Sequence, residues 1–184
     1  MRYLEGRRQD DRQARSDHLL ERIERRRSIR KFTPQDVSDQ QIRLLLSAGM
    51  AAPSGHNFQP WHFVVVREED NRLALAETHG YAGMIKQAPA VIAVCADSEM
   101  SLHWLEDACL AAGNILLQAT ALGLGAVWVA VYPHAEHEIF VRGVLGIPER
   151  IRVVCLIPVG YPAEAKPPRT KYDPGKVHLE RFGG

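Results

Sequence analysis

What the sequence lacks narrows the classes of protein that it can encode. No window approaches the roughly 20 consecutive apolar residues that a membrane-spanning helix needs. The 184 residues contain only three cysteines, and no two of them form a Cys-x-x-Cys pair. We therefore expect neither a membrane protein nor a disulfide or zinc framework.

An excess of charge of one sign is also lacking. The formal net charge is +1, from 23 Lys and Arg residues against 22 Asp and Glu residues. Such a chain has no overall field that would attract nucleic acid or an anionic membrane. The N-terminus has no apolar stretch typical of a signal peptide, so the expected location is cytoplasmic.

What is present fits one globular domain. Hydrophobic residues make up 46% of the chain and charged residues 24%, and 184 residues can enclose a single core. Residues 1–16 are polar and patternless, and we expect a flexible leader there, followed by one domain over residues 17–184. Each cysteine lies in an apolar run, which indicates buried and inert thiols.

Apolar periodicity predicts helices mixed with strands, an α+β or three-layer architecture. Ser38 and Gln41 have capping-box spacing, which predicts the start of a helix. Residues 101–122 are apolar on nearly all sides and predict a long central helix. The remaining predicted elements are helices at 19–23, 71–79 and 136–145 and strands at 62–66, 89–95, 126–132 and 152–159. The proline-rich tail after Tyr161 predicts an arm without regular structure.

The first cluster that could carry chemistry is Arg25-Arg26-Arg27-Ser28-Ile29-Arg30-Lys31. Arginine forks match the oxygens of a phosphate group in pairs, and a serine adds a hydroxyl donor. In an extended segment the alternate residues Arg26, Ser28 and Arg30 would point the same way. Taken alone, such a cluster is more often a solvated basic surface. A nucleic-acid patch is a weaker interpretation, because stacking aromatic residues are missing nearby.

The second cluster is the loop Ala52-Pro53-Ser54-Gly55-His56-Asn57-Phe58-Gln59-Pro60-Trp61. Its small residues would let the backbone approach a flat ligand closely. His56, Asn57 and Gln59 add hydrogen-bonding groups. Taken alone, the loop is as well explained by a turn that leads into the strand at 62–66.

Together, in this order and spacing, the two clusters resemble those of the FMN-dependent nitroreductase family. Residues 114–128 are similar to the family's central helix and following strand, and residues 156–162 to its last core strand. The resemblance spans residues 22–182. It implies a three-layer α/β/α sandwich with a central, mostly antiparallel sheet and an extended C-terminal arm.

The resemblance also implies roles in binding FMN. The residues expected to hold the phosphate and ribityl chain are Arg26, Arg27, Ser28 and Arg30. Those expected to pack over the flavin ring from the partner subunit of a homodimer are Pro53, Ser54, Gly55 and Asn57. The backbone expected to face the ring near N5 is that of Trp128, Val129 and Ala130. A basic residue of the C-terminal arm is expected at the phosphate, Lys171 in the first place and Arg169 in the second.

The sequence departs from the family at Tyr81-Ala82-Gly83-Met84, where some members carry an Asn and a Lys that touch the flavin. Family members often cover the substrate with this stretch, and Tyr81 could stack there. Whether it forms a lid is not indicated by the residues.

Three further features are expected to be structural. Gly123-Leu124-Gly125 follows a helix and precedes a strand, the reverse of a dinucleotide-binding turn. His134-Ala135-Glu136-His137-Glu138 lacks metal-site spacing and predicts a solvated helix start. Asp107 and Asn114 share one face of the long helix, and we expect hydrogen-bonded pairing within the protein rather than a flavin contact.

The function implied is an oxidoreductase that uses NADH or NADPH in a ping-pong cycle to reduce a flat conjugated acceptor, such as a nitroaromatic or a quinone. No side chain is expected to act as a nucleophile or obligate base, and no metal is expected. The expected partners are a second copy of the chain and a small-molecule substrate. The alternatives are a deiodinase-like or flavin-cleaving branch of the family, a non-catalytic FMN-binding or redox-sensing protein, and a nucleic-acid module at residues 22–31.

Overall fold

The structure, a computed structural model, describes residues 19–183; the leader expected at residues 1–16 lies outside them. The described chain divides into two compact units. The larger unit comprises residues 26–166, and the smaller one combines the described parts of the two terminal segments, up to Arg25 and from Pro167. Within residues 19–183, no helix is long and apolar enough to cross a membrane.

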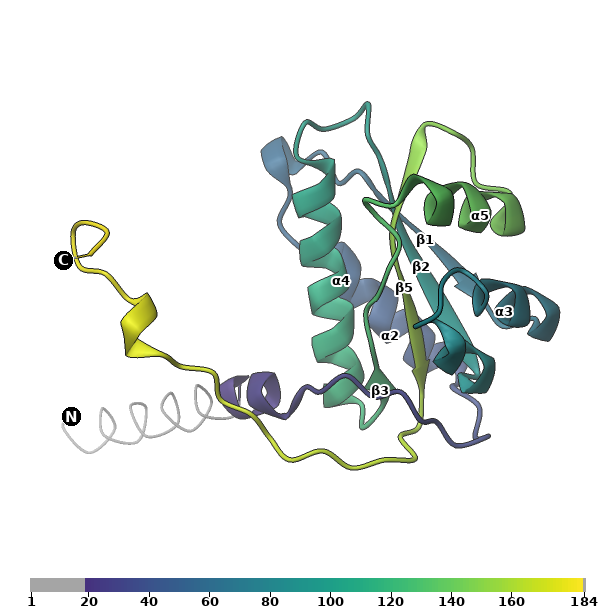
Figure 1. Cartoon of the computed structure of the whole chain (residues 1–184), viewed down its shortest axis with the longest axis horizontal. Coiled ribbons are helices and arrows are strands. Elements are labelled where there is room, and N and C mark those ends of the chain that lie inside the picture. The colour runs from purple at the N-terminus through teal and green to yellow at the C-terminus, as the bar shows by residue number, and fades with distance from the viewer. Residues whose placement is uncertain (1–18, 184) are drawn as a thin grey trace, which may run out of the picture. The chain divides into compact units, whose positions relative to one another are not determined.

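The larger unit is built on one antiparallel sheet (Figure 1). Its strands are β1 (Trp61–Val66), β2 (Ala90–Asp97), β3 (Gly125–Ala126), β4 (Val129–Ala130) and β5 (Ile151–Gly160). The strand order is β1-β2-β5-β3, and β4 also pairs with β5. Every residue of β2 is buried, which explains its unbroken apolar sequence.

Helices cover both faces of this sheet (Figure 1). On one face, α2 (Asp39–Met50) and α4 (Trp104–Ala121) pack with the β2 residues Ile92 and Val94. On the other face, α3 (Glu69–Leu75) and α5 (Ala135–Leu145) pack with Val91 and Ala93. Alternate residues of one strand thus fill two cores, and the expected three-layer sandwich is confirmed.

The helix predicted from its capping box is confirmed, whereas two other elements differ from expectation. The Ser38 hydroxyl accepts the N–H of Gln41. The helix expected at 71–79 spans Glu69–Leu75 instead. It ends early because the Thr78 hydroxyl donates to the Leu75 carbonyl at 2.6 Å, an acceptor that a longer helix would use itself.

The single strand expected at 126–132 is wrong, because the structure has the two short strands β3 and β4 there. Both pair with β5, and their register places Val127 opposite Pro158. Proline has no N–H to donate to a ladder. The ladder is interrupted at Val127 and Trp128, two residues that become important for the site.

The smaller unit contains a helix over residues 19–25 and the C-terminal tail. The N–H of Arg169 donates to the Glu24 carbonyl at 3.0 Å. The tail lacks strands but includes the 3-10 turn η3 (Pro174–Lys176), capped by Asp173, so the expectation of no regular structure is wrong for these residues.

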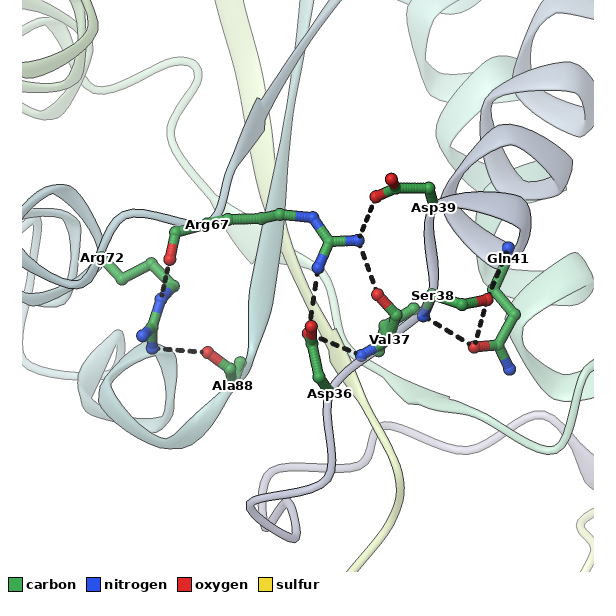
Figure 2. A network of polar contacts seen from close by, with 8 residues as sticks. All are labelled: Asp36, Val37, Ser38, Asp39, Gln41, Arg67, Arg72 and Ala88. Atoms are coloured by element: carbon green, nitrogen blue, oxygen red, sulfur yellow. Dashed lines mark hydrogen bonds and ion pairs between the residues drawn. The ribbon is translucent and has the colours of Figure 1, made fainter.

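Two arginines tie neighbouring elements of the larger unit together (Figure 2). Arg67, directly after β1, forms ion pairs with Asp36 at 2.9 Å and Asp39 at 3.1 Å, at the start of α2. Arg72 of α3 donates to the carbonyls of Arg67 at 3.0 Å and Ala88 at 2.7 Å. These contacts fix how the chain enters α2 and β2.

A buried ion pair anchors α5 to the sheet. Glu138, only 4% exposed, accepts two hydrogen bonds from Arg152 at 2.7 and 2.8 Å and one from the N–H of Val153 at 3.0 Å. The Arg152 guanidinium also lies over the rings of Trp104 and Tyr132. Burial alone would raise the pKa of Glu138, but the hydrogen bonds from Arg152 and Val153 outweigh it and lower this pKa.

We predict that Glu138→Gln lowers the free energy of unfolding at pH 7 by about 1.5–3 kcal/mol, because a charged hydrogen-bond acceptor is lost. The folded pKa of Glu138 lies below its ordinary value of 4.5, so its stabilisation is present above that value and is lost as pH falls through the folded pKa. The deficit of the variant should therefore shrink in acid. Urea unfolding at fixed protein concentration across pH 3–7 measures it.

The matched control is Glu136→Gln, an exposed residue of the same helical turn. Its effect should stay below about 1 kcal/mol, the scale of a charge near a helix terminus. Equal effects of the two substitutions, or a deficit of Glu138→Gln that is independent of pH, would contradict the anchoring role of Glu138.

Candidate functional site

A pocket of about 530 Å³ is formed by three segments that are far apart in the sequence. Its lining residues are Arg30, His79, Gly80, Tyr81, Gly83, Met84, Val127, Trp128, Val129 and Ala130. The interruption between β3 and β4 thus forms one wall, and the turn before β2, which includes η2 (Gly83–Gln87), forms another. The pocket brings Arg30 of the first predicted motif together with all of the predicted Trp128–Ala130 stretch.

The Ser28–Arg30 segment extends the sheet at its β3 edge. Ser28 forms a parallel bridge with Ala126, and the N–H of Ile29 donates to the Ala126 carbonyl at 3.1 Å. Ile29 is buried, whereas Ser28 is half-buried and Arg30 is exposed, as expected for an extended segment. A Cβ at Gly125 would lie 2.6 Å from Ile29, so only glycine permits this close approach.

A second segment runs antiparallel to this one on its other side. Phe32 and Pro162 form an antiparallel bridge, and the same register sets Arg30 opposite Glu164 and Ser28 opposite Lys166. The Arg30 N–H donates to Glu164 at 2.6 Å, and Lys166 donates to the Ser28 carbonyl.

An ion pair within this second segment places a positive charge beside Ser28. Glu164 pairs with Lys166 at 3.1 Å. The N–H of Arg30, together with Lys166, lowers the pKa of Glu164 although partial burial opposes the shift. Glu164 is therefore an anion that holds the Lys166 ammonium beside Ser28.

Lys166 is a basic residue at this site that the sequence interpretation missed. The expectation for the C-terminal arm named Lys171 and Arg169, which belong to the smaller unit, and their role stays a prediction. In the sequence, Glu164 and Lys166 are two residues apart, as are Ser28 and Arg30, but this equal spacing does not show that the two pairs lie opposite each other. Without the Phe32–Pro162 pairing, nothing indicated which residues faced each other.

The loop Pro53–Asn57 is held in an unusual backbone conformation. His56, Asn57 and Gln59 have positive φ angles of 49°, 58° and 51°, a region that costs a non-glycine residue about 1 kcal/mol or more. The loop is stabilised internally, since the Gln59 N–H donates to the Ser54 hydroxyl and the Gln59 side chain to Asn57. Three strained residues within four positions are typical of a segment shaped for contact with a ligand or partner.

Asp107 fastens this loop to the first turn of α4. It accepts the N–H of Gly55 at 3.0 Å and the hydroxyl of Ser101 at 3.1 Å. On the same helix, Asn114 donates to the Ala48 carbonyl at 3.0 Å. Within this chain both polar residues are therefore paired with protein, as the sequence analysis expected.

The loop and the pocket do not meet within one chain. Figure 1 shows the turn η1 (Gly55–Asn57) near the N-terminal end of α4 and β3 near its opposite end. None of residues 53–57 is among the described residues that line the pocket. The two clusters that the sequence analysis predicted to form one flavin site are therefore separated in the single chain.

Other reactive groups offer no competing centre. Among residues 19–183, no group of three His, Cys, Asp or Glu side chains could hold a metal ion. The cysteines are free, and burial raises the pKa of Cys95 to about 12. The solvated helix start expected at His134–Glu138 is wrong for Glu138, which is buried in its ion pair with Arg152.

Comparison with known proteins shows the family to which this chain belongs. The sequence profile of the nitroreductase family matches residues 23–78 and 70–161. A protein of Methanothermobacter thermautotrophicus with the provisional name NADH dehydrogenase/NAD(P)H nitroreductase is 42% identical over 167 residues, which are 89% of this chain and 87% of that protein. The chain belongs to the nitroreductase family.

Two solved structures show that this likeness extends to the fold. A nitroreductase-type protein of Bacteroides thetaiotaomicron, also provisionally named, superposes with a TM-score of 0.87 at 43% identity, over 89% of this chain and 98% of that one. A nitroreductase-type protein of Desulfovibrio desulfuricans, solved in complex with FMN, superposes with a TM-score of 0.75 at 33% identity, over 89% and 96% of the two chains.

Proposed function

We propose that this nitroreductase-family chain is an FMN-dependent oxidoreductase that uses NADH or NADPH to reduce a flat conjugated acceptor, such as a nitroaromatic or a quinone. The observation that carries the proposal is the pocket that Arg30 lines together with Val127–Ala130. Its volume of about 530 Å³ lies within the range of ordinary ligand sites.

The residues around the pocket fit the two ends of FMN. A phosphate monoester needs several charge-assisted donors, and Arg30, Lys166 and the Ser28 hydroxyl lie within one short stretch of paired backbone. Arg26 and Arg27 precede them and complete the basic cluster. An isoalloxazine ring needs apolar contact, which Trp128, Val129 and Met84 supply.

When bound, FMN accepts a hydride from NAD(P)H and then passes electrons to the acceptor, in a ping-pong cycle. The protein's own part is binding, orientation and exclusion of water. Of the residues that line the pocket, only Arg30, His79 and Tyr81 have titratable side chains, and none of them is a typical catalytic nucleophile. Tyr81 is 86% exposed at the rim, a position from which its ring could stack on a flat acceptor.

The active unit in this proposal is a homodimer with two composite sites. The layer formed by α2 and α4 exposes the apolar side chains Leu44, Met50 and Leu110, a surface typical of an interface between identical chains. Pro53, Ser54, Gly55 and Asn57 of one chain would then lie over the flavin ring held by the other. This arrangement explains why the strained loop and the pocket are separate in one chain.

We predict that Arg30→Ala weakens FMN binding by about 1.5–3 kcal/mol, because one charge-assisted contact to the phosphate is lost. This loss corresponds to about a ten- to hundredfold rise in Kd. The melting temperature of the FMN-free protein should hardly change, since the Arg30 side chain is exposed. Fluorescence titration with FMN and thermal unfolding measure the two effects.

The matched control is Arg43→Ala, an exposed arginine of α2 that does not line the pocket. Its FMN affinity should equal that of the wild type. Unchanged affinity of Arg30→Ala together with a lowered melting temperature would make the arginine cluster structural.

We predict that two inactive variants complement each other when their subunits mix. One variant carries Arg30→Ala, and the other carries Ser54→Ala with Asn57→Ala. In a heterodimer with composite sites, one site holds all the damage and the other is intact, so a sizeable fraction of wild-type activity should return. The measurement is NAD(P)H oxidation with menadione after subunit exchange in mild denaturant.

Heterodimers isolated by two different affinity tags provide the critical sample. If they form but remain inactive, or if a monomer is fully active at assay concentration, the composite site is wrong. Release of iodide from an iodinated phenol, or fragmentation of FMN, in the same assay would favour the deiodinase-like or flavin-cleaving alternative.

A further inference from the structure

A histidine links two walls of the pocket. His79 lies in the turn after α3 and lines the pocket together with Tyr81 and Met84. Its Nδ1 accepts the N–H of Tyr81 at 3.1 Å, and its Nε2 lies 3.1 Å from the carbonyl of Ala130 in β4. The imidazole therefore bridges the Tyr81 turn to the strand on the opposite side of the same pocket.

The two partners fix the protonation state of this bridge. A backbone N–H can only donate, and a backbone carbonyl can only accept. Nδ1 must therefore carry its lone pair and Nε2 its hydrogen, which is one tautomer of the neutral ring. Addition of a proton to Nδ1 would set two donors against each other, and the hydrogen bond from Tyr81 would be lost.

Two further histidines lie near His79. On α5, the His137 ring lies 5.0 Å from that of His79 and 4.9 Å from that of His134. Nδ1 of His137 is buried without a hydrogen-bond partner. Burial, His79 and His134 all lower the pKa of His137, and Glu136 opposes them.

The other titratable groups near His79 lie in its own turn and on neighbouring segments. Tyr81 belongs to its own turn, with ring centroids 6.4 Å apart, and Arg30 lines the same pocket. Farther along, Glu77 and Lys86 pair with each other at 2.7 Å.

We infer that His79 is a positioning residue, which as a neutral imidazole pins the Tyr81–Met84 wall to β4 and on protonation releases it. The inference rests on the proposed function, because this wall would meet the acceptor. In mildly acidic solution the acceptor pocket should loosen while FMN stays bound.

Hydrogen exchange on the FMN-loaded protein tests the clamp directly. At pH 7.5, His79→Phe should exchange amide hydrogens in peptides that cover residues 79–87 at least fivefold faster than the wild type, with β2 and β5 unchanged. His79→Asn should restore at least half of this protection, because an amide oxygen can replace Nδ1 as acceptor. His62→Asn, at an exposed histidine of β1, is the matched control and should behave as wild type.

The pH dependence of amide protection and of KM is a second test, because a merely structural role of His79 would not produce it. Between pH 7.5 and 5.5, the protection of this segment, corrected for intrinsic exchange, should fall in the wild type and stay flat in His79→Asn. The KM for menadione should rise at least threefold over the same range in the wild type only. The rate at which NAD(P)H reduces bound FMN should keep the same pH dependence in both proteins.

The outcomes separate this inference from the proposed function. If FMN binds and is reduced while His79→Phe exchanges like the wild type, or if the wild type and His79→Asn share one pH profile, the clamp is wrong. If the protein binds no FMN, the proposed function fails, and exchange at pH 7.5 in the FMN-free protein still decides whether His79 holds the wall.

Discussion

Backbone pairing at the open edge of the sheet is the constraint on which the site depends. The Ser28–Arg30 segment lies between Ala126 on one side and the Glu164–Lys166 segment on the other. Gly125 allows the close approach of Ile29, and the burial of Ile29 leaves Ser28 and Arg30 accessible. Hydrogen bonds therefore fix the backbone of the Ser28–Arg30 segment, and the Ser28 carbonyl and Glu164 hold the Lys166 ammonium beside it.

Strand pairing at the same edge of the sheet also shapes the part of the pocket lined by Val127–Ala130. The ladder between the β3–β4 stretch and β5 is interrupted where Val127 stands opposite Pro158. Val127 and Trp128, which lie outside the regular pairing, line the pocket with Val129 and Ala130 of β4. The His79 imidazole links the wall that contains Tyr81 to β4.

Much of this organisation could be predicted from the sequence. Periodic apolar residues and the capping box at Ser38 predicted most of the helices and strands, because burial and capping are local signals. The arginine motif and the Trp128–Ala130 stretch were predicted as parts of one site, and Arg30 of the motif lines the pocket together with that stretch. What could not be predicted depends on pairing between distant segments. Lys166 faces Ser28 only because Phe32 pairs with Pro162, and Glu138 of α5 is buried against a partner, Arg152, that lies on β5.

The central claim is that this pocket holds FMN that takes a hydride from a nicotinamide nucleotide. The most direct test is the visible absorption spectrum of the purified protein, followed anaerobically during addition of NADH or NADPH. We expect a yellow protein with non-covalently bound FMN, whose flavin band bleaches with at least one nucleotide and returns when menadione is added. A colourless protein that takes up no FMN at high micromolar concentration, or bound FMN that neither nucleotide reduces, would contradict the account.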